Sequence, residues 1–334
     1  MPNWYVDPDQ SDDSGTGESW ATAKKHLNAM IQALTYPLAG ENVIYLKVGA
    51  TNPYEEDDNS INLSNILCAG PSGKLIIQPE TYLDGNYQQG LDPFDDTDPA
   101  PMNAETQVYP LSLNLSFWCI NAFNVELRGL EIAAADNGCG LLVRGPGSVK
   151  AAYCRLIDCV NIGVNADQGV NFDSENGCIR DSGSGLLAAT KAQARLSGAN
   201  RLTDCAMVGI AAVLDGLVLV APWEDHGDFG LLEIRTTKPV TETTAILVMQ
   251  RGTVSICTGE DLSAIHGAAL VKVIDQTEQA GTENHRGVML GSKGMVTGKK
   301  NIVFRESSVN DGEDTIAPAQ QFMQMPDEDT LLVD

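Results

Sequence analysis

The feature that most constrains the fold of this chain is an internal repeat in its middle third. Three hexapeptides share an apolar third residue and an aspartate in the fifth position; they begin at Cys154, Gly177 and Asn200, so both steps are 23 residues. A second column consists of glycines spaced by 23, 22 and 24 residues: Gly140, Gly163, Gly185 and Gly209. Two columns with the same period indicate stacked copies of one structural unit.

Each unit contains about three short apolar runs separated by Gly, Asn or Asp, and no helix long enough for a crossover between parallel strands. Because such a unit cannot bury its own apolar face, it must stack on its neighbours. Units made only of strands predict a parallel coil whose turns lie about 4.8 Å apart. We expect Leu156, Ile179 and Leu202 to stack inward in this coil.

The rest of the chain is divided by its composition. Ser19 can cap an amphipathic helix that runs to about Leu34. Three segments are expected: a strand and capping helix at 1–40, the coil at 41–310 with an Asp- and Pro-rich excursion at 84–107 and looser spacing after 215, and an acidic, partner-bound tail at 311–334.

The N-terminal residues carry a resemblance to a known superfamily. The segments concerned are 4–7, the turn residues Asp12, Gly15 and Gly17, 20–23, 43–49, Tyr54-Glu55 and 61–63. They are similar to the lead-in and first turn of the right-handed parallel β-helices of pectate-lyase type. The resemblance covers 3–80 by motif and 116–310 by period. It implies an all-β, right-handed parallel β-helix of about 23 residues per turn with one N-terminal capping helix, but fold does not fix function.

This superfamily includes polysaccharide lyases, polygalacturonase-like hydrolases and virus tail proteins. The hydrolase pattern of Asn-x-Asp, Asp-Asp, Gly-His and Arg-x-Lys on successive turns is absent. Asp95-Asp96 lies in the excursion, and His266 precedes Gly267 instead of following a glycine. The basic residues are scattered, which does not favour a lyase base beside carboxylate-bound calcium.

The repeated aspartates are one candidate for catalysis. Asp158, Asp181 and Asp204 on neighbouring turns would lie about 5 Å apart, near the roughly 5–5.5 Å separation of a retaining glycosidase pair. The alternative is a repeated turn position, where Asp bonds its own backbone.

A loop that interrupts the repeat is the other candidate. It combines the potential acid/base residues Glu224, Asp225 and His226 with two aromatic residues that could stack on a glycan, Trp223 and Phe229. The alternative is a polar loop flanked by core-facing aromatics.

Metal binding has weak support in the sequence. Asp7, Asp9, Asp12 and Asp13 could hold calcium, although they do not match the regular twelve-residue loop, and a solvated acidic turn is the alternative. No other cofactor is expected. The eight cysteines form no Cys-x-x-Cys pair and are expected to be buried, reduced thiols.

The charge and hydropathy patterns exclude two classes of partner. With 21 basic against 45 acidic side chains, the net charge is −24, which disfavours binding to nucleic acid phosphates. No run of 18 apolar residues predicts a membrane span. The N-terminus lacks a basic stretch followed by an apolar one, so synthesis without a secretory signal is expected.

These patterns favour a non-catalytic structural or receptor-facing virion protein, such as a bacteriophage tail or capsid-decorating β-helix. We expect a homotrimer, contacts with other virion proteins, and binding to cell-surface polysaccharide. The alternatives are a tail-spike polysaccharide depolymerase, either hydrolase or lyase, and a bacterial surface carbohydrate-binding protein. Whether the chain is an enzyme stays open at this point.

Overall fold

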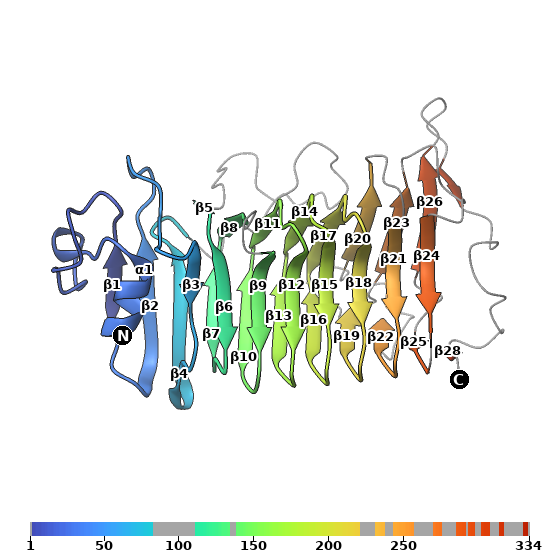
Figure 1. The fold of residues 1–334 in the computed structure, drawn as a ribbon, viewed down its shortest axis with the longest axis horizontal. Coiled ribbons are helices and arrows are strands. Elements are labelled where there is room, and N and C mark those ends of the chain that lie inside the picture. The colour runs from blue at the N-terminus through green and yellow to red at the C-terminus, as the bar shows by residue number, and fades with distance from the viewer. Residues whose placement is uncertain are drawn as a thin grey trace, which may run out of the picture.

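The chain forms an elongated stack of strands in the computed structural model (Figure 1). The described residues are 2–82, 111–133, 138–220, 231–237, 243–256, 270–275, 285–291, 293–297, 302–307, 314–316 and 330–332. Among them, successive strands run through three sheets in turn, so that each sheet receives every third strand along most of the stack.

Sheet A has eleven strands: β1 (Asn3–Val6), β2 (Leu38–Leu46), β4 (Cys68–Pro79), β7 (Val125–Arg128), β10 (Ser148–Ala152), β13 (Asn171–Glu175), β16 (Gln193–Ser197), β19 (Leu217–Val220), β22 (Thr253–Ile256), β25 (Met295–Thr297) and β28 (Thr330–Leu332). Sheet B has eight: β3 (Ser60–Asn62), β6 (Ser116–Ile120), β9 (Cys139–Arg144), β12 (Ile162–Asp167), β15 (Ser184–Ala188), β18 (Val208–Ala212), β21 (Thr243–Val248) and β24 (His285–Leu290). Sheet C has nine: β5 (Leu111–Leu113), β8 (Leu130–Ala133), β11 (Arg155–Ile157), β14 (Cys178–Arg180), β17 (Ala199–Thr203), β20 (Leu231–Thr236), β23 (Leu270–Asp275), β26 (Ile302–Ser307) and β27 (Asp314–Ile316).

The pairing within the sheets is parallel except at the C-terminal end. There, β27 pairs with β26 and β28 pairs with β25 in the antiparallel sense. Two short pieces of the segment expected to be a partner-bound tail therefore extend the protein's own sheets. The predominantly parallel, mostly β architecture fits a parallel β-solenoid.

The apolar residues of the repeat stack between the sheets, as the sequence predicts. Leu156 pairs with Ile179, and Ile179 pairs with Leu202, so partners in this column are 23 residues apart. All three side chains are buried in one continuous core. Equivalent apolar positions on neighbouring strands thus supply together the burial that no single strand could provide.

The repeated glycines lie inside strands of sheet B, where the chain packs closely on this core. A Cβ atom on Gly185 would lie 2.4 Å from the Gly209 carbonyl oxygen and 2.4 Å from Leu202 Cδ2. Gly140 and Gly163 are similarly crowded. Close packing, and not turn geometry, explains this column.

The predicted helix from Ser19 to Leu34 is wrong in its first half. Ser19 precedes only a 3-10 turn, Trp20–Thr22, and the α-helix α1 spans Leu27–Ala33. The intervening Lys24 is tied to β1 by backbone hydrogen bonds, because its N–H donates to the Tyr5 carbonyl at 3.1 Å and its carbonyl accepts from Asp7 at 2.9 Å. An extended residue at this point interrupts a continuous helix.

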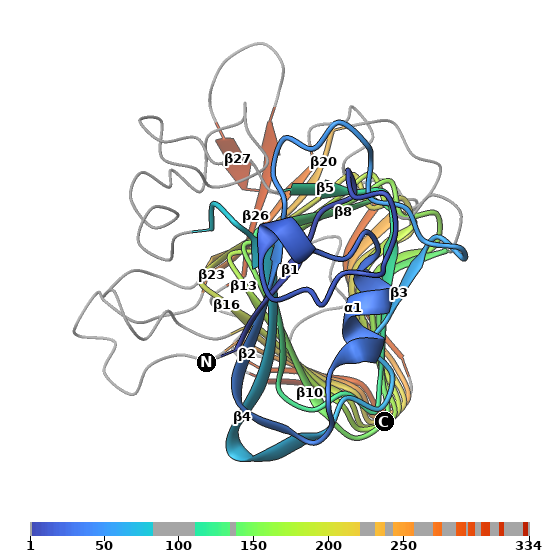
Figure 2. The same cartoon turned by 90° about the vertical axis from the view of Figure 1, so that its left-hand side faces the viewer.

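Helix α1 lies at the N-terminal end of the stack (Figure 2). Leu27, Met30 and Ile31 are buried in the same core cluster as Val6 and Leu46. The helix therefore covers apolar residues of the first strands, as expected for a cap.

Two further expectations concern the excursion and membrane spans. The excursion at 84–107 lies outside them. Within them, no helix is long and apolar enough to cross a membrane.

Candidate functional site

A groove of about 530 Å³ lies on the outer face of sheet A. Its residues come from β4, β7, β10, β13, β16 and β19, together with Asn124 just before β7. Strand alternation explains the polarity of this face. In β10 and β13, Val149 and Phe172 point into the core, so Lys150 and Asp173 point outward.

Charges of alternating sign form the central column of the groove. Glu126 of β7 pairs in register with Lys150 of β10, which pairs with Asp173 of β13, which pairs with Arg195 of β16. Neighbouring strands lie about 4.8 Å apart, so each charge faces an opposite charge. The groove thus lacks the acidic excess of the chain as a whole.

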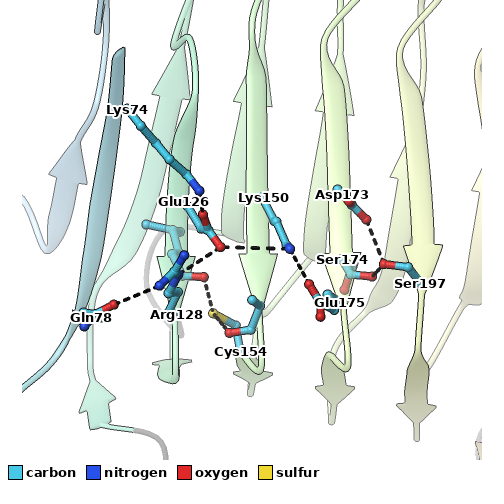
Figure 3. Close-up of polar contacts among 12 residues, drawn as sticks. Lys74, Gln78, Glu126, Arg128, Lys150, Cys154, Asp173, Ser174, Glu175 and Ser197 are labelled. Atoms are coloured by element: carbon cyan, nitrogen blue, oxygen red, sulfur yellow. Dashed lines mark hydrogen bonds and ion pairs between the residues drawn. The ribbon is translucent and has the colours of Figure 1, made fainter. Parts of the chain in front are cut away.

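The Glu126 carboxylate lies at the centre of an ion-pair network (Figure 3). Its Oε1 is 2.9 Å from Arg128 Nε and 4.0 Å from Lys150 Nζ, and its Oε2 pairs with Lys74 Nζ. Burial would raise the pKa of Glu126, which is only 3% exposed, but hydrogen bonds and charges from Arg128 and Lys74 outweigh burial and hold the pKa below its ordinary value. Glu126 is therefore an ionised carboxylate at neutral pH.

Asp173 lies in the same groove in a different environment. Burial raises the pKa of its carboxyl group, against the lowering effect of a 3.1 Å hydrogen bond from Ser197 Oγ and of the Lys150 charge. Lys150 itself forms an ion pair with Glu175, which outweighs the effect of burial and raises the Lys150 pKa. Two carboxyl groups of one groove thus have pKa values shifted in opposite directions.

A second column of uncharged polar residues runs beside the charges. Ser148, Asn171 and Gln193 are paired in register on β10, β13 and β16, and all three line the groove. Ser148 Oγ also donates to Asn124 Oδ1 and accepts from the Asn124 N–H, both at 3.0 Å. Amide and hydroxyl groups can donate and accept at the same time, which suits them to a ligand rich in hydroxyl groups.

The predicted aspartate column lies at corners that follow sheet C. Asp158, Asp181 and Asp204 each have a φ of 52° to 54°, in the left-handed region. Each backbone N–H donates to the next turn, for example from Asp181 to Thr203 O at 3.1 Å. These positions are equivalent, as the repeat predicts, and their backbone has the geometry of the turn alternative.

The side chains of Asp181 and Asp204 have partners within the protein. Asp181 lies 3.1 Å from Arg180 Nε. Asp204 accepts hydrogen bonds from the N–H and hydroxyl of Thr237 at 2.6 and 2.7 Å. The contact of Asp204 joins two neighbouring turns, whereas that of Asp181 is to the adjacent residue. Both lie at the corners that follow sheet C, not in the groove of sheet A.

The four N-terminal aspartates accept hydrogen bonds from nearby backbone. Asp9 accepts from the N–H groups of Thr51 and Asn52, both at 2.8 Å. Asp7 and Asp12 accept from Asp9 and Ser14.

Asp13 accepts from the N–H of His26 at 2.9 Å, and its other oxygen lies 2.6 Å from His26 Nδ1. Burial would raise the pKa of Asp13, but the contacts with His26 outweigh it and lower the pKa. The described residues contain no group of three or more acidic, His or Cys side chains that could hold a metal ion.

Two other predictions concern the loop and the cysteines. The loop residues Trp223, Glu224, Asp225, His226 and Phe229 lie outside the described residues. The seven described cysteines are all free thiols, and five of them are buried. Burial raises the pKa of Cys154 to about 12, as expected for an inert core thiol.

Sequence reasoning missed the groove residues. Glu126, Lys150, Asp173 and Arg195 follow one another at steps of 24, 23 and 22 residues, close to the period of the repeat. This third column was detectable, but it carries no constant residue type. Its members share only alternating charge and an outward position.

Comparison with known proteins adds limited information. No protein-family model matches the sequence, and no curated protein sequence matches it. Among solved structures, the selenomethionine derivative of a GH136 lacto-N-biosidase from Eubacterium ramulus has a TM-score of 0.41 and 12% identity, over 92% of this chain and 64% of that chain. The native form of that enzyme has a TM-score of 0.27 and 10% identity, over 87% and 68%. The chain thus spans less than two thirds of the first structure, and at these scores neither likeness bears on its function.

Proposed function

We propose that this protein binds a polysaccharide in the groove of sheet A, as a receptor-facing protein of a virus particle. The observation that carries the proposal is the groove itself, where paired columns of charged and of amide or hydroxyl side chains run across several strands. Such a surface offers donors and acceptors at regular intervals to a repetitive, hydroxylated ligand. The near balance of charges in the groove also avoids the repulsion that the acidic chain would exert on an acidic glycan.

We further propose that the turns close into a right-handed coil of about 23 residues each. The register of the sheets supports this proposal, because the paired residues Leu141 and Val164 of β9 and β12 are 23 residues apart, and Val164 and Leu186 are 22 apart. Right-handedness follows the general preference of parallel strand connections.

The virion setting and the homotrimer are proposals that rest on the sequence. Light scattering of the purified chain tests the trimer, for which we expect three times the chain mass of 35.6 kDa. A monomer at micromolar concentration contradicts it. Immunogold labelling of intact particles tests the virion location, and labelled host cytoplasm with unlabelled particles contradicts it.

Glycan binding is tested by an array of capsular, lipopolysaccharide and other bacterial glycans, followed by titration calorimetry with the strongest ligand. The double variant Asn171→Ala with Gln193→Ala removes two amide groups from the groove. Loss of about 1 kcal/mol for each hydrogen bond predicts an affinity roughly tenfold to thirtyfold weaker.

The matched control is Asn114→Ala, which removes an exposed amide that follows β5 on sheet C. We expect this variant to bind like the wild type. A chain that binds no glycan, or a groove variant that binds as tightly as the control, contradicts the proposal.

Hydrolysis of the glycan is a second candidate function, which the opposite pKa shifts of Glu126 and Asp173 favour. The two residues lie two strands apart in one column, so their backbones are about 10 Å apart by ordinary strand spacing, and the candidate requires the two carboxyl groups to lean toward each other. Inverting glycosidases hold a general acid and a general base roughly 6.5–9.5 Å apart, with their pKa values set by different environments. Asp173, with the raised pKa, would protonate the leaving oxygen, and Glu126 would accept a proton from water.

This candidate is tested by incubating the protein with polysaccharides and measuring new reducing ends. If the chain is a hydrolase, Asp173→Asn loses cleavage and keeps glycan binding. Release of unsaturated products would instead indicate a lyase. An intact polysaccharide that binds the protein leaves the non-catalytic function as the conclusion.

A further inference from the structure

A cluster of aromatic side chains lies at the N-terminal end of the outer face of sheet A. Tyr5 of β1 and Tyr45 of β2 are paired in register, and their rings stack with centroids 5.7 Å apart and planes at 25°. The Trp20 ring meets Tyr5 edge-on at 4.7 Å, and Lys47 Nζ lies 4.7 Å from the centre of the Trp20 ring. We call these four residues the aromatic platform.

The aromatic platform is separate from the buried core. Val6, Ile44 and Leu46 of the same two strands are completely buried and belong to the core cluster. The four platform residues are partly exposed and do not belong to it. Their partly exposed rings and polar groups form an amphipathic surface of the kind that Tyr and Trp supply at binding sites.

The platform is continuous with the groove. Tyr45 pairs in register with Gln78 of β4. Gln78 accepts a hydrogen bond from Arg128 at 3.4 Å, and Arg128 pairs with Glu126 at the edge of the groove. From Tyr5 to Arg128 this path crosses three strand intervals, or about 14 Å.

We propose that the aromatic platform is a second sugar-binding subsite, which binds another part of the same glycan that occupies the groove. A pyranose ring packs by its apolar face across the outer edges of the stacked Tyr5 and Tyr45 rings. The Lys47 ammonium, which also pairs with Glu80 at 3.6 Å, donates to a hydroxyl or carboxylate of the sugar. The glycan then runs along the axis of the stack, with its other end in the groove. The inference rests on the proposed glycan-binding function and extends it, because it specifies an oligosaccharide long enough to occupy both sites.

The length dependence of binding tests this inference. Chito-oligosaccharides and oligogalacturonates, each from disaccharide to octasaccharide, are titrated against the wild type and against Tyr5→Ala with Tyr45→Ala. We expect the double variant to bind the long members about three- to thirtyfold more weakly, as for the loss of one or two aromatic contacts, and the short members like the wild type.

Two controls separate the possible explanations. Trp118→Ala removes a half-buried aromatic residue from β6 of sheet B and should bind every length like the wild type. Tyr5→Phe with Tyr45→Phe keeps the rings and should retain most of the affinity for long chains. If the double alanine variant does not fold, Tyr45→Ala alone replaces it and should still weaken the binding of long chains more than that of short ones.

Each failure has a distinct signature. Equal losses for short and long chains, or no loss for long chains, overturn the platform and leave the groove intact if Asn171→Ala with Gln193→Ala still weakens binding. Binding of neither series overturns the platform as stated, and failure of the whole glycan array overturns the proposed function as well.

Discussion

The Arg128 guanidinium lies 2.9 Å from the Glu126 carboxylate on β7, and one residue separates the two in the sequence. Alternation places both side chains on the outer face of sheet A, where Lys74 and Lys150 approach the same carboxylate from neighbouring strands. One buried negative charge thereby holds together three strands of the sheet.

Glu126→Gln should destabilise the protein by about 1–3 kcal/mol at pH 7, because it leaves three cations without their shared partner. The lowered pKa of Glu126 means that this stabilisation is present above about pH 4.3 and is lost as the pH falls through the lower pKa of the folded state. Denaturant unfolding should therefore show a difference in the free energy of unfolding between the wild type and Glu126→Gln at pH 7, and this difference should disappear at pH 3.

The control for this variant is Asp215→Asn. Asp215 pairs at 2.8 Å with Arg251, whose side chain is 68% exposed, so its loss should cost under about 0.5 kcal/mol. Equal costs for the two variants contradict the central role of Glu126.

Asp173→Asn should stabilise the protein at pH 7, in contrast to Glu126→Gln. A raised pKa means that the contribution of Asp173 is fully favourable below about pH 3.9 and is lost as the pH rises through the higher pKa of the folded state. The variant should therefore be more stable than the wild type at pH 7 and equally stable near pH 3. Unfolding midpoints of the variant and the wild type, measured from pH 3 to pH 7, check the sign of this stability difference. A variant that is less stable than the wild type at pH 7 refutes the prediction.

Gly185→Ala should destabilise the stack by about 1–3 kcal/mol through overpacking against Leu202 and Gly209. Gly169 provides the contrast, since its φ is +79° and nothing lies within 4 Å of the added Cβ. Asn tolerates a left-handed backbone, so Gly169→Asn should recover most of the stability lost in Gly169→Ala, whereas Gly185→Asn should recover none. Thermal unfolding of the four variants distinguishes crowding from backbone strain.

Asp181→Asn should leave stability within about 0.5 kcal/mol of the wild type and leave glycan binding unchanged, because Asn also accepts the left-handed turn at this position. Asp181→Val should cost about 1–2 kcal/mol, since a β-branched residue is strained there. Loss of any glycan-cleaving activity in a stable Asp181→Asn protein would restore the catalytic interpretation of this column.

The period of the sequence predicted the strand stacking because burial must repeat wherever turns stack. Leu156, Ile179 and Leu202 can be identified in this way, since only apolar residues satisfy their position. The prediction of a helix starting at Ser19 was wrong because a long-range bridge between Lys24 and Val6 overrides the local pattern of apolar spacing. No local rule could have shown that bridge.

The groove was harder to predict for a different reason. Outward residues are free to vary in type, so Glu126, Lys150 and Asp173 share no sequence signature apart from their spacing. The aspartates that do repeat are constrained by a turn, which is why a constant residue at a fixed period indicated structure more strongly than chemistry.

The most direct test of the central claim is a crystal structure of the protein with the strongest glycan of the array. We predict sugar density over the outer face of β7, β10, β13 and β16, with contacts to Asn171 and Gln193. A glycan bound at the loop 223–229 or on sheet B or C, with an empty groove, would contradict the account.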